Sequence, residues 1–351
     1  MLENVVSTVP IFNVKVDGSE LSADAMVSIE SVMFEEELNT ASMFVLKLAT
    51  SDFEKGAWRF VDLEYFRLGV EVKLFMGMDN LVPMIVGEIT SLKPSFSESS
   101  STIIEIRGYD RLHRLRFGSK RRTFVAVKDS DIASTIAGEW GLSAKAEDTG
   151  TVHSHIYQNN LNDLEFLLQR AKRIRYEVFV DDKSLHFQSP KESDPASLIL
   201  EYGVDIVEFS FELSARYEGD EVVVQGWDFM KKKQILATSK GGTGMSMMDT
   251  KDTGTNMTKS AFGSFSSYIV DEQLVDVSDA EELAVARYNT HLEESVTGEG
   301  KCVGIPELRA GNTIEIKGID RFSGTYYVTS TTHVIDRNGY NTSFKVRRVG
   351  I

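Results

Sequence analysis

The sequence has almost no cysteine and no long hydrophobic run. Cys302 is the only cysteine among 351 residues, so no disulfide within the chain can stabilise it, and we expect this thiol to be a small buried hydrophobe. No stretch approaches the roughly 20 apolar residues of a membrane span. The first four residues include Glu3 and no basic residue, and no signal peptide is visible. These absences predict a protein without membrane insertion that is made and folded in the cytoplasm.

Motifs of catalytic, metal and nucleotide sites are missing as well. There is no HExxH, CxxC, Gly-x-Ser-x-Gly or Walker-type phosphate loop. His153 and His155 come nearest to a metal pair, but no third ligand has a suitable spacing, and we interpret them as surface or turn histidines. The glycine-rich segment 241–244 precedes Met and Ser where a phosphate loop needs Lys. For His333 we expect cross-strand packing or hydrogen bonding. The sequence therefore predicts no enzyme, with no catalytic, cofactor-binding or metal-binding residue and no cofactor.

The net charge of −15 disfavours nucleic-acid binding, because phosphates attract a positive surface. One segment, 107–122, is basic against this background, with Asp110 as its only acid. Its basic residues are Arg107, Arg111, Arg114, Arg116, Lys120, Arg121 and Arg122. We interpret the segment as a solvated face or a contact with an acidic neighbouring subunit, and we expect no specific nucleic-acid binding.

What the chain does contain is a short phrase that occurs three times. A run that alternates apolar and polar residues ends in Gly, an apolar residue and Asp at 104–110, 222–228 and 314–320. Alternation with period two is typical of a half-buried strand, and Asp after Gly favours a turn. Three copies suggest a duplicated β-unit, which is typical of scaffolds and rings.

The first third of the chain has the pattern of several short strands. Alternating or apolar runs occupy 9–16, 27–34, 43–49, 70–75, 84–89 and 103–106. This spacing predicts a sandwich or a barrel. Residues 123–195 differ, because they contain two helix signals followed by strands at 176–180 and 184–188.

Both helix signals of that segment include caps. An acidic cluster at 129–131 precedes an apolar face and ends before Gly141. Asn162 and Glu165 have the spacing of a capping box, and Leu161 and Phe166 that of a hydrophobic staple. The segment is therefore predicted to be a compact α+β insert.

The rest of the chain returns to β structure with one interruption. Residues 199–229 are strand-like, whereas 239–267 lose all periodicity and predict a long loop or an arm. A capping box at Ser278 and Glu281 begins a helix that extends to about 292. The last β segment, 302–349, contains Asn338-Gly339, a strong hairpin signal.

These patterns predict a mainly β fold with α+β inserts: two β-barrel or sandwich domains plus two peripheral domains. The first β domain is expected at 1–120 and the α+β insert domain at 121–196. The second β domain is expected to be split between 197–235 and 301–351, around an inserted loop-plus-helix domain at 236–300.

Several segments together resemble the late control gene D family of contractile phage tails, over nearly the whole chain. The first are Gly-Tyr-Asp-Arg-Leu at 108–112, Thr123-Phe124, 131–133, Gly141-Leu142 and 158–160. The others are Asp163, 165–167, Arg170-Ala171, Tyr176-Glu177, and Gly324-Thr-Tyr-Tyr-Val with His333, Gly339-Tyr340, Thr342 and 344–347. Proteins of that family, and the related N-terminal part of VgrG spikes, form the trimeric hub of a baseplate.

The resemblance implies a structural protein of a contractile tail or injection system. Its two β domains would be tail-tube-like, so that a homotrimer gives six similar units in a ring between the six-fold tail tube and the three-fold central spike. The implied partners are the tail tube protein, a separate spike protein, because the chain stops at Ile351 after the closing hairpin, and baseplate wedge proteins around the insert and the arm. The implied location is the bacterial cytoplasm during assembly and then the baseplate of a virion tail or extracellular injection particle.

A second hypothesis is a carbohydrate- or peptidoglycan-binding tail protein. The insert at 123–195, with a capped helix near a pair of strands, resembles a LysM module, although a docking domain of similar size would have the same pattern. Binding to purified cell wall distinguishes the two, because a hub should not bind it.

Overall fold

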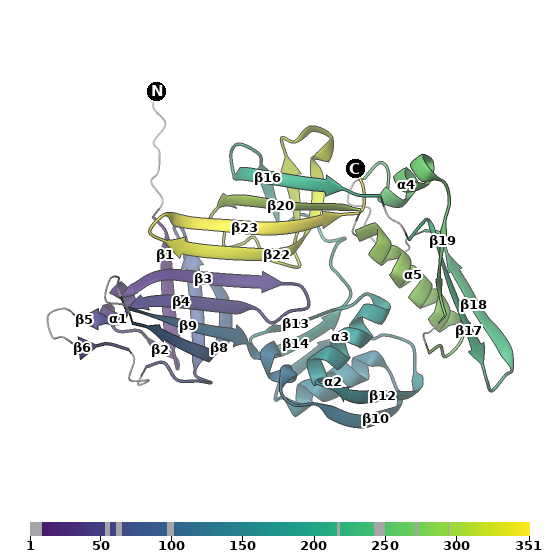
Figure 1. The fold of residues 1–351 in the computed structure, drawn as a ribbon, viewed down its shortest axis with the longest axis horizontal. Helices are drawn as coiled ribbons and strands as arrows, with labels where there is room; N and C mark the ends of the chain where they lie inside the picture. Colours follow the sequence, from purple (N-terminus) through teal and green to yellow (C-terminus); the bar gives the residue numbers. More distant parts are fainter. Residues whose placement is uncertain are drawn as a thin grey trace.

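The structure is a computed structural model that describes residues 9–52, 57–60, 65–96, 102–215, 218–241, 250–270, 273–293 and 295–351. It is mainly β with several antiparallel sheets, as the sequence predicts. In Figure 1 two β halves lie one above the other, an α+β unit lies beside the lower half, and a third unit built around a long helix lies at the right.

One 13-stranded sheet runs through both β halves. The first half contains β1 (Ile11–Val16), β2 (Ser19–Glu20), β3 (Ile29–Glu37), β4 (Met43–Ala49), β7 (Glu71–Gly77), β8 (Val82–Ser95) and β9 (Ile103–Asp110), with helix α1 (Ala23–Val27). The second half contains β15 (Leu198–Glu201), β16 (Ile206–Leu213), β20 (Val296–Val303), β21 (Thr313–Lys317), β22 (Gly324–Asp336) and β23 (Gly339–Arg348), with the 3-10 turn η2 (Asp320–Phe322). β5 (Ser51–Asp52) and β6 (Ala57–Trp58) form a separate short pair.

The large sheet is open. Its strands follow the order β16-β20-β23-β22-β3-β4-β9-β8-β7-β1-β2, and no pairing between the described strands joins the two ends into a barrel. Of the two expected forms, barrel or sandwich, a closed barrel is therefore not seen among the described strands, because closure depends on long-range pairing that alternation within a strand cannot show. Each half packs its own core, one around Phe34, Leu46 and Ile106, the other around Ile316, Tyr326 and Phe344.

The α+β unit follows the first half directly. It contains η1 (Arg111–Arg116), β10 (Lys120–Val127), α2 (Asp129–Glu139), β11 (Ser143–Ala146), β12 (His153–Leu161), α3 (Asp163–Ile174), β13 (Glu177–Asp181) and β14 (Ser184–Gln188). The predicted capping box of α3 is present, since the side chain of Asn162 accepts the Glu165 N–H at 2.8 Å. The apolar sides of α2 and α3 share one core with Phe187.

The third unit differs from expectation. It contains β17 (Glu221–Asp228), β18 (Lys233–Ser239), α4 (Gly254–Phe262), β19 (Ser266–Ile269) and α5 (Val277–Glu293). Part of the aperiodic stretch 239–267 is thus ordered: Thr253 caps α4, and β19 pairs in parallel with β17, a partner about 45 residues away that no local pattern reveals. Residues 242–249 of the expected loop lie outside the described residues. β17 and β18 pack on α5 and belong to no part of the large sheet, although the expected second β domain included them.

The thrice-repeated phrase marks strands that are not equivalent. Its copies lie in β9, which is central in the first half, in β17 of the small sheet, and in β21 of the second half. The three copies share only a local feature, a strand that ends in a turn. The prediction that they mark the copies of a duplicated β-unit is therefore wrong.

Candidate assembly surfaces

The two β halves nevertheless repeat one arrangement of strands. The order β3-β4-β9-β8-β7 in the first half matches β16-β20-β23-β22-β21 in the second. The irregularities match too, because each half has one bulge in its first strand pair and one in its central hairpin. These bulges lie at Ile29/Ser31 and Ile206/Glu208, and at Ile89/Ser91 and Val328/Ser330.

A glycine before β7 and one before β21 confirm the alignment of the halves. Gly69 and Gly311 have φ of 82° and 81°, a region that favours glycine. Their N–H groups donate to the carbonyl oxygens of Ile89 (2.8 Å) and Val328 (2.9 Å) respectively. Together with the bulges, these positions align the residues of β3 with those of β16 and the residues of β8 from Ile89 onward with those of β22 from Val328 onward.

The halves are connected edge to edge by β3 and β22, a contact that we call the internal joint. The strands are antiparallel, with Phe34 opposite His333 and Glu36 opposite Thr331. These four side chains face the core and are buried, with Phe34 and His333 fully inaccessible. Figure 1 shows β22 and β3 as adjacent strands of one continuous sheet.

His333 is a packing and hydrogen-bonding residue of this joint. Its ring stacks on Phe34, its Nδ1 lies 2.9 Å from the Tyr340 hydroxyl, and its Nε2 lies 3.0 Å from the Leu308 carbonyl oxygen. Burial lowers its pKa to about 4, so the imidazole is neutral at pH 7. This agrees with the role expected from the sequence.

An ion pair between the buried Glu36 and the partly buried Arg309 stabilises the same joint. Glu36 accepts from Arg309 Nε at 2.7 Å and Nη2 at 2.8 Å, from the Ala310 N–H at 2.7 Å and from the Thr331 hydroxyl at 3.1 Å. The Arg309 guanidinium also lies over the Phe34 ring. No local pattern in the sequence indicates this pair, because 273 residues separate its members and only the strand register brings them together.

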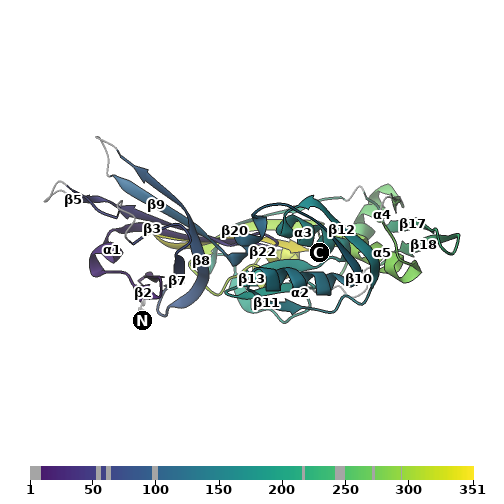
Figure 2. The same ribbon diagram turned by 90° about the horizontal axis from the view of Figure 1, so that it is seen from below.

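The counterparts of the joint strands are largely unpaired on their outer sides within the described part of the chain. There, the outer edge of β16 is bonded only at Ile206, whose carbonyl oxygen accepts the Gly203 N–H at 3.0 Å, and no strand pairs with β8 beyond Ile89 on the side of β7. We call the two segments 207–213 and 90–95 the open edges, and Phe96 follows the second directly. Figure 2 shows the β8–β9 hairpin projecting from the first half.

Apolar side chains are exposed on both open edges where their counterparts are buried. Phe211 is 38% exposed, whereas its counterpart Phe34 is fully buried. Phe96 is 57% exposed, whereas its counterpart Ile335 is 6% exposed. The internal joint therefore shows that pairing with a second strand would bury these apolar side chains on each open edge.

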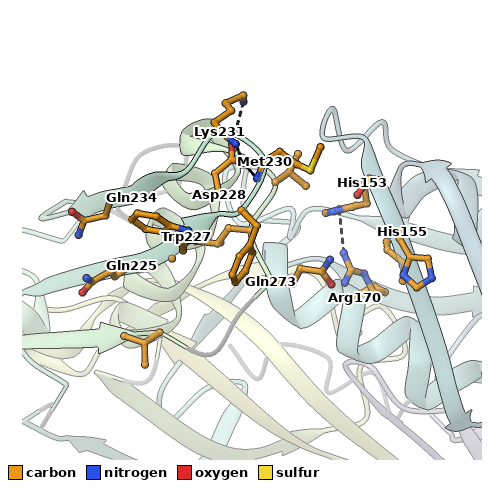
Figure 3. A pocket seen from close by; sticks show the side chains of 17 residues that line it. His153, His155, Arg170, Gln225, Trp227, Asp228, Met230, Lys231, Gln234 and Gln273 are labelled. Carbon is orange, nitrogen blue, oxygen red and sulfur yellow. Dashed lines mark hydrogen bonds and ion pairs between the residues drawn. The ribbon is translucent and has the colours of Figure 1, made fainter.

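A cleft of about 1330 Å³ separates the α+β unit from the β17–β18 hairpin (Figure 3). His153 lies on its wall, 3.1 Å from Arg170 Nη2 and 3.4 Å from Asp129 Oδ2. Burial alone would raise the pKa of Asp129, but hydrogen bonds from His153 and Arg170 outweigh it and hold this pKa below its usual value. His155 extends along the same strand without joining this group (Figure 3). Among the described residues no cluster of three or more His, Cys, Asp or Glu could hold a metal ion.

Trp227 dominates the opposite wall of the cleft. It is 51% exposed on β17, with Gln225 on the same strand and Gln234 opposite it on β18. Asp228 turns the hairpin by accepting the N–H groups of Met230 (3.0 Å) and Lys231 (2.8 Å). The wall thus offers one aromatic face and amide groups, and no nucleophile paired with a base.

The basic segment 107–122 is largely used within the chain. Arg111 pairs with Glu71 at 2.5 Å and with Asp182, and Arg114 binds Glu88. Further along, Lys120 and Arg122 both bind Asp163, at 2.6 and 2.9 Å. These bonds attach η1 and β10 to their neighbours, so these four residues are bonded within the chain, whereas Arg107, Arg116 and Arg121 are exposed, as expected for a solvated face.

Three units meet at a cluster of buried charges. Tyr327 on β22 donates to Glu177 Oε2 at 2.9 Å, and burial raises the pKa of Glu177 to about 7. Arg347 on β23 binds Glu192 at 2.8 Å and Glu293 of α5 at 2.9 Å. The cluster links the second β half, the α+β unit and α5, and so fixes where the open edges lie relative to both.

Two further positions singled out in the sequence are Cys302 and the glycine-rich segment 241–244. Cys302 is fully buried, its thiol lies 3.5 Å from the Thr342 carbonyl oxygen, and burial raises its pKa to about 12. Gly241 is described, and the rest of the 241–244 segment lies outside the described residues. No helix in the described ranges is long and apolar enough to cross a membrane.

Comparison with known proteins places the chain in a family. A family model described as the Alg8 N-terminal domain matches residues 6–337. The chain belongs to the Alg8 N-terminal domain family. A comparison with proteins of curated function finds no match for this family member.

Solved structures share the fold of this Alg8 N-terminal domain. A 43 kDa tail protein of prophage MuSo2 from Shewanella oneidensis matches with a TM-score of 0.72 and 16% identity, over 97% of this chain and 98% of that one. An E. coli component of the type VI secretion system, described as similar to T4 tail proteins gp27 and gp5, matches at 0.60 and 13%, over 95% and 76%. A chain of the Francisella PdpA–VgrG complex matches at 0.56 and 11%, over 99% and 54%. The resemblance to phage-tail and VgrG-like proteins inferred from the sequence is thus confirmed in the fold.

Proposed function

We propose that this chain is a structural hub of a contractile tail or injection system. Three copies would form a pseudo-hexameric ring that joins a six-fold tail tube to a three-fold central spike. The observation that carries the proposal is the internal joint: one chain already contains two equivalent half-sheets, bonded edge to edge, and each ends in an open edge of the matching kind. Repetition of that joint between copies is the simplest way to cover both edges.

The faces of the sheet support distinct roles. The side chains opposite the cores alternate between charged and small polar groups, among them Lys47, Glu105, Lys301 and Lys345. We infer that this face lines a central channel, while the cores face outward. The α+β unit and the unit around α5 would then lie outside the ring and meet wedge proteins, and the exposed Phe229 at the β17–β18 turn is a suitable contact.

The expected domains are proposed in a modified form. The first tail-tube-like domain includes β1 to β9, and the α+β domain extends from η1 to β14. The second tube-like domain unites β15 and β16 with β20 to β23, and the third unit, from β17 to α5, is inserted between them. This division follows the four separate hydrophobic cores.

The native mass of the purified protein tests the proposal. Light scattering should give three times the chain mass of 39.2 kDa, for the protein alone or mixed with its candidate spike. Electron micrographs of that sample should show rings. A monomer in both samples, with no stimulation of tube assembly, would contradict a hub.

The Trp227 wall supports a second candidate, binding of cell-wall carbohydrate. Sugars stack on exposed aromatic faces, and the amides of Gln225 and Gln234 could bind hydroxyl groups. Sedimentation with purified peptidoglycan tests it: a carbohydrate-binding protein co-sediments, and Trp227→Ala abolishes this. A hub without such a site stays in the supernatant.

A further inference from the structure

We propose that neighbouring copies join through β16 of one chain and the end of β8 of the next, in the register of the internal joint. The inference rests on the proposed ring and specifies how the ring is bonded. Because β16 is the counterpart of β3 and β8 that of β22, the register of the internal joint can be transferred residue by residue. Glu35 lies opposite Thr332 in the internal joint, so Glu212 should lie opposite Lys93 of the next copy.

The core-facing side chains fit this register. Opposite Glu36 and Thr331 of the internal joint, the transferred positions are Leu213 and Leu92, two apolar residues. Leu213 is 41% exposed in the single chain, and Leu92 is partly buried against the first core. The next pairs toward the end of β8 place Phe211 opposite Pro94 and Phe209 opposite Phe96. Apolar groups therefore meet apolar groups along the whole core side.

On the face of the sheet opposite the cores, the proposed register brings together side chains of opposite charge. Glu212 and Lys93 are both exposed, and neither takes part in a described ion pair within the chain. Directly opposed side chains of opposite charge stabilise an antiparallel pair. The positions on either side are small and polar, with Ser210 opposite Ser95 and Ser214 opposite Ser91. A shift by two residues would place Glu212 opposite Ser91 or Ser95 and lose the charge pair.

One position differs from the internal joint. Pro94 is the counterpart of His333 and has no N–H to donate, so the joint between copies has a weaker ladder at this point. Proline is tolerated on edge strands for this reason. The two open edges are also different from each other, and each copy therefore contacts its neighbours head to tail. A head-to-tail contact gives a closed ring when its rotation divides a full turn into a whole number of steps. The proposed ring of six half-sheets closes if internal and external joints each rotate the sheet by one sixth of a turn.

Cysteine cross-linking tests the register in the full-length protein. Opposed residues of an antiparallel pair have Cα atoms about 4.5–5.5 Å apart, which a disulfide can span. The double variant Lys93→Cys/Glu212→Cys should give dimers and trimers on a non-reducing gel after mild oxidation, with the trimer as the largest product. The matched control Ser91→Cys/Glu212→Cys should remain monomeric on the same gel. The native Cys302 does not interfere, because it is fully buried.

Charge reversal gives a second readout that needs no oxidation. Lys93→Glu or Glu212→Lys alone should lower the trimer fraction measured by light scattering, and the double variant Lys93→Glu/Glu212→Lys should restore it. A trimer that cross-links only through Ser91→Cys, or through neither pair, would overturn the register and leave the hub intact. If the wild-type protein forms no trimer alone or with its candidate spike and does not stimulate tube assembly, the proposed function itself fails, and the inference fails with it.

Discussion

Replacing Glu36 by alanine should destabilise the protein by about 3 kcal/mol, the lower end of the cost of removing one partner of a buried ion pair, because 28% of the Arg309 side chain is exposed. Glu36 is 8% exposed and accepts four hydrogen bonds, two of them from Arg309. The substitution leaves the partly buried Arg309 guanidinium without its carboxylate, although the Met84 carbonyl oxygen still accepts from it at 3.0 Å. Urea unfolding followed by circular dichroism measures the loss.

Two matched variants separate the ion pair from the rest of the joint. Glu36→Leu combined with Arg309→Met replaces the pair by apolar groups, as Leu213 does in the second half. It should cost only about 1–3 kcal/mol, for the Ala310 N–H and the Thr331 hydroxyl, which lose their acceptor. Glu35→Gln, on the other face of the same strand, should change the free energy of unfolding by no more than about 0.5 kcal/mol. If Glu36→Ala costs no more than Glu35→Gln, the ion pair does not fasten the joint.

Three further changes probe other parts of the molecule. The folded-state pKa of Glu177, about 7, exceeds the ordinary value of 4.5. This group therefore favours folding at low pH, and its contribution to stability is lost as the pH rises from about 4.5 to 7. Glu177→Gln should flatten that part of a plot of unfolding free energy against pH, and an unchanged slope would contradict the prediction. Gly108→Ala would place a Cβ 2.4 Å from the Phe44 ring and from the Glu88 carbonyl oxygen, and the overpacking should cost at least about 1–3 kcal/mol in thermal melting. Asn162→Ala removes the cap of α3 and should cost about 1 kcal/mol, with Asn162→Asp as the control that keeps it.

Local signals in the sequence predicted the elements well where the cause is local. Asn162 and Glu165 predicted the start of α3 because both halves of a capping box lie within one turn. The hairpin at Asn338-Gly339 was also predicted, although Asp336 pairs with Gly339, so the two loop residues are Arg337 and Asn338. Stability of such elements depends on neighbours in sequence, and the sequence displays those neighbours directly.

The assembly surfaces could not be predicted in the same way. Glu36 meets Arg309 because β3 pairs with β22 in one particular register. A shift of that register by one residue would turn Glu36 to the other face of the sheet. The repeated Gly-apolar-Asp phrase was misleading for a related reason: it records local turn chemistry, whereas the true repeat consists of strand order and bulges, which any alternating sequence can satisfy. Only the register revealed that Phe211 is the exposed counterpart of Phe34.

The internal joint and the proposed joint between copies form at different stages, and their residues differ accordingly. The internal joint forms while the chain folds, so the Glu36–Arg309 pair can be desolvated together with the surrounding core and then fixes one register. The proposed joint between copies must form from two surfaces that are already folded and hydrated, and there a buried charge would have to be stripped of water during association. Leucine at position 213, where the first half has Glu36, avoids that penalty, and the exposed Glu212 and Lys93 can attract one another before contact and remain hydrated afterwards. The replacement of glutamate by leucine between the halves is therefore the expected signature of one sheet arrangement used once within a chain and once between chains.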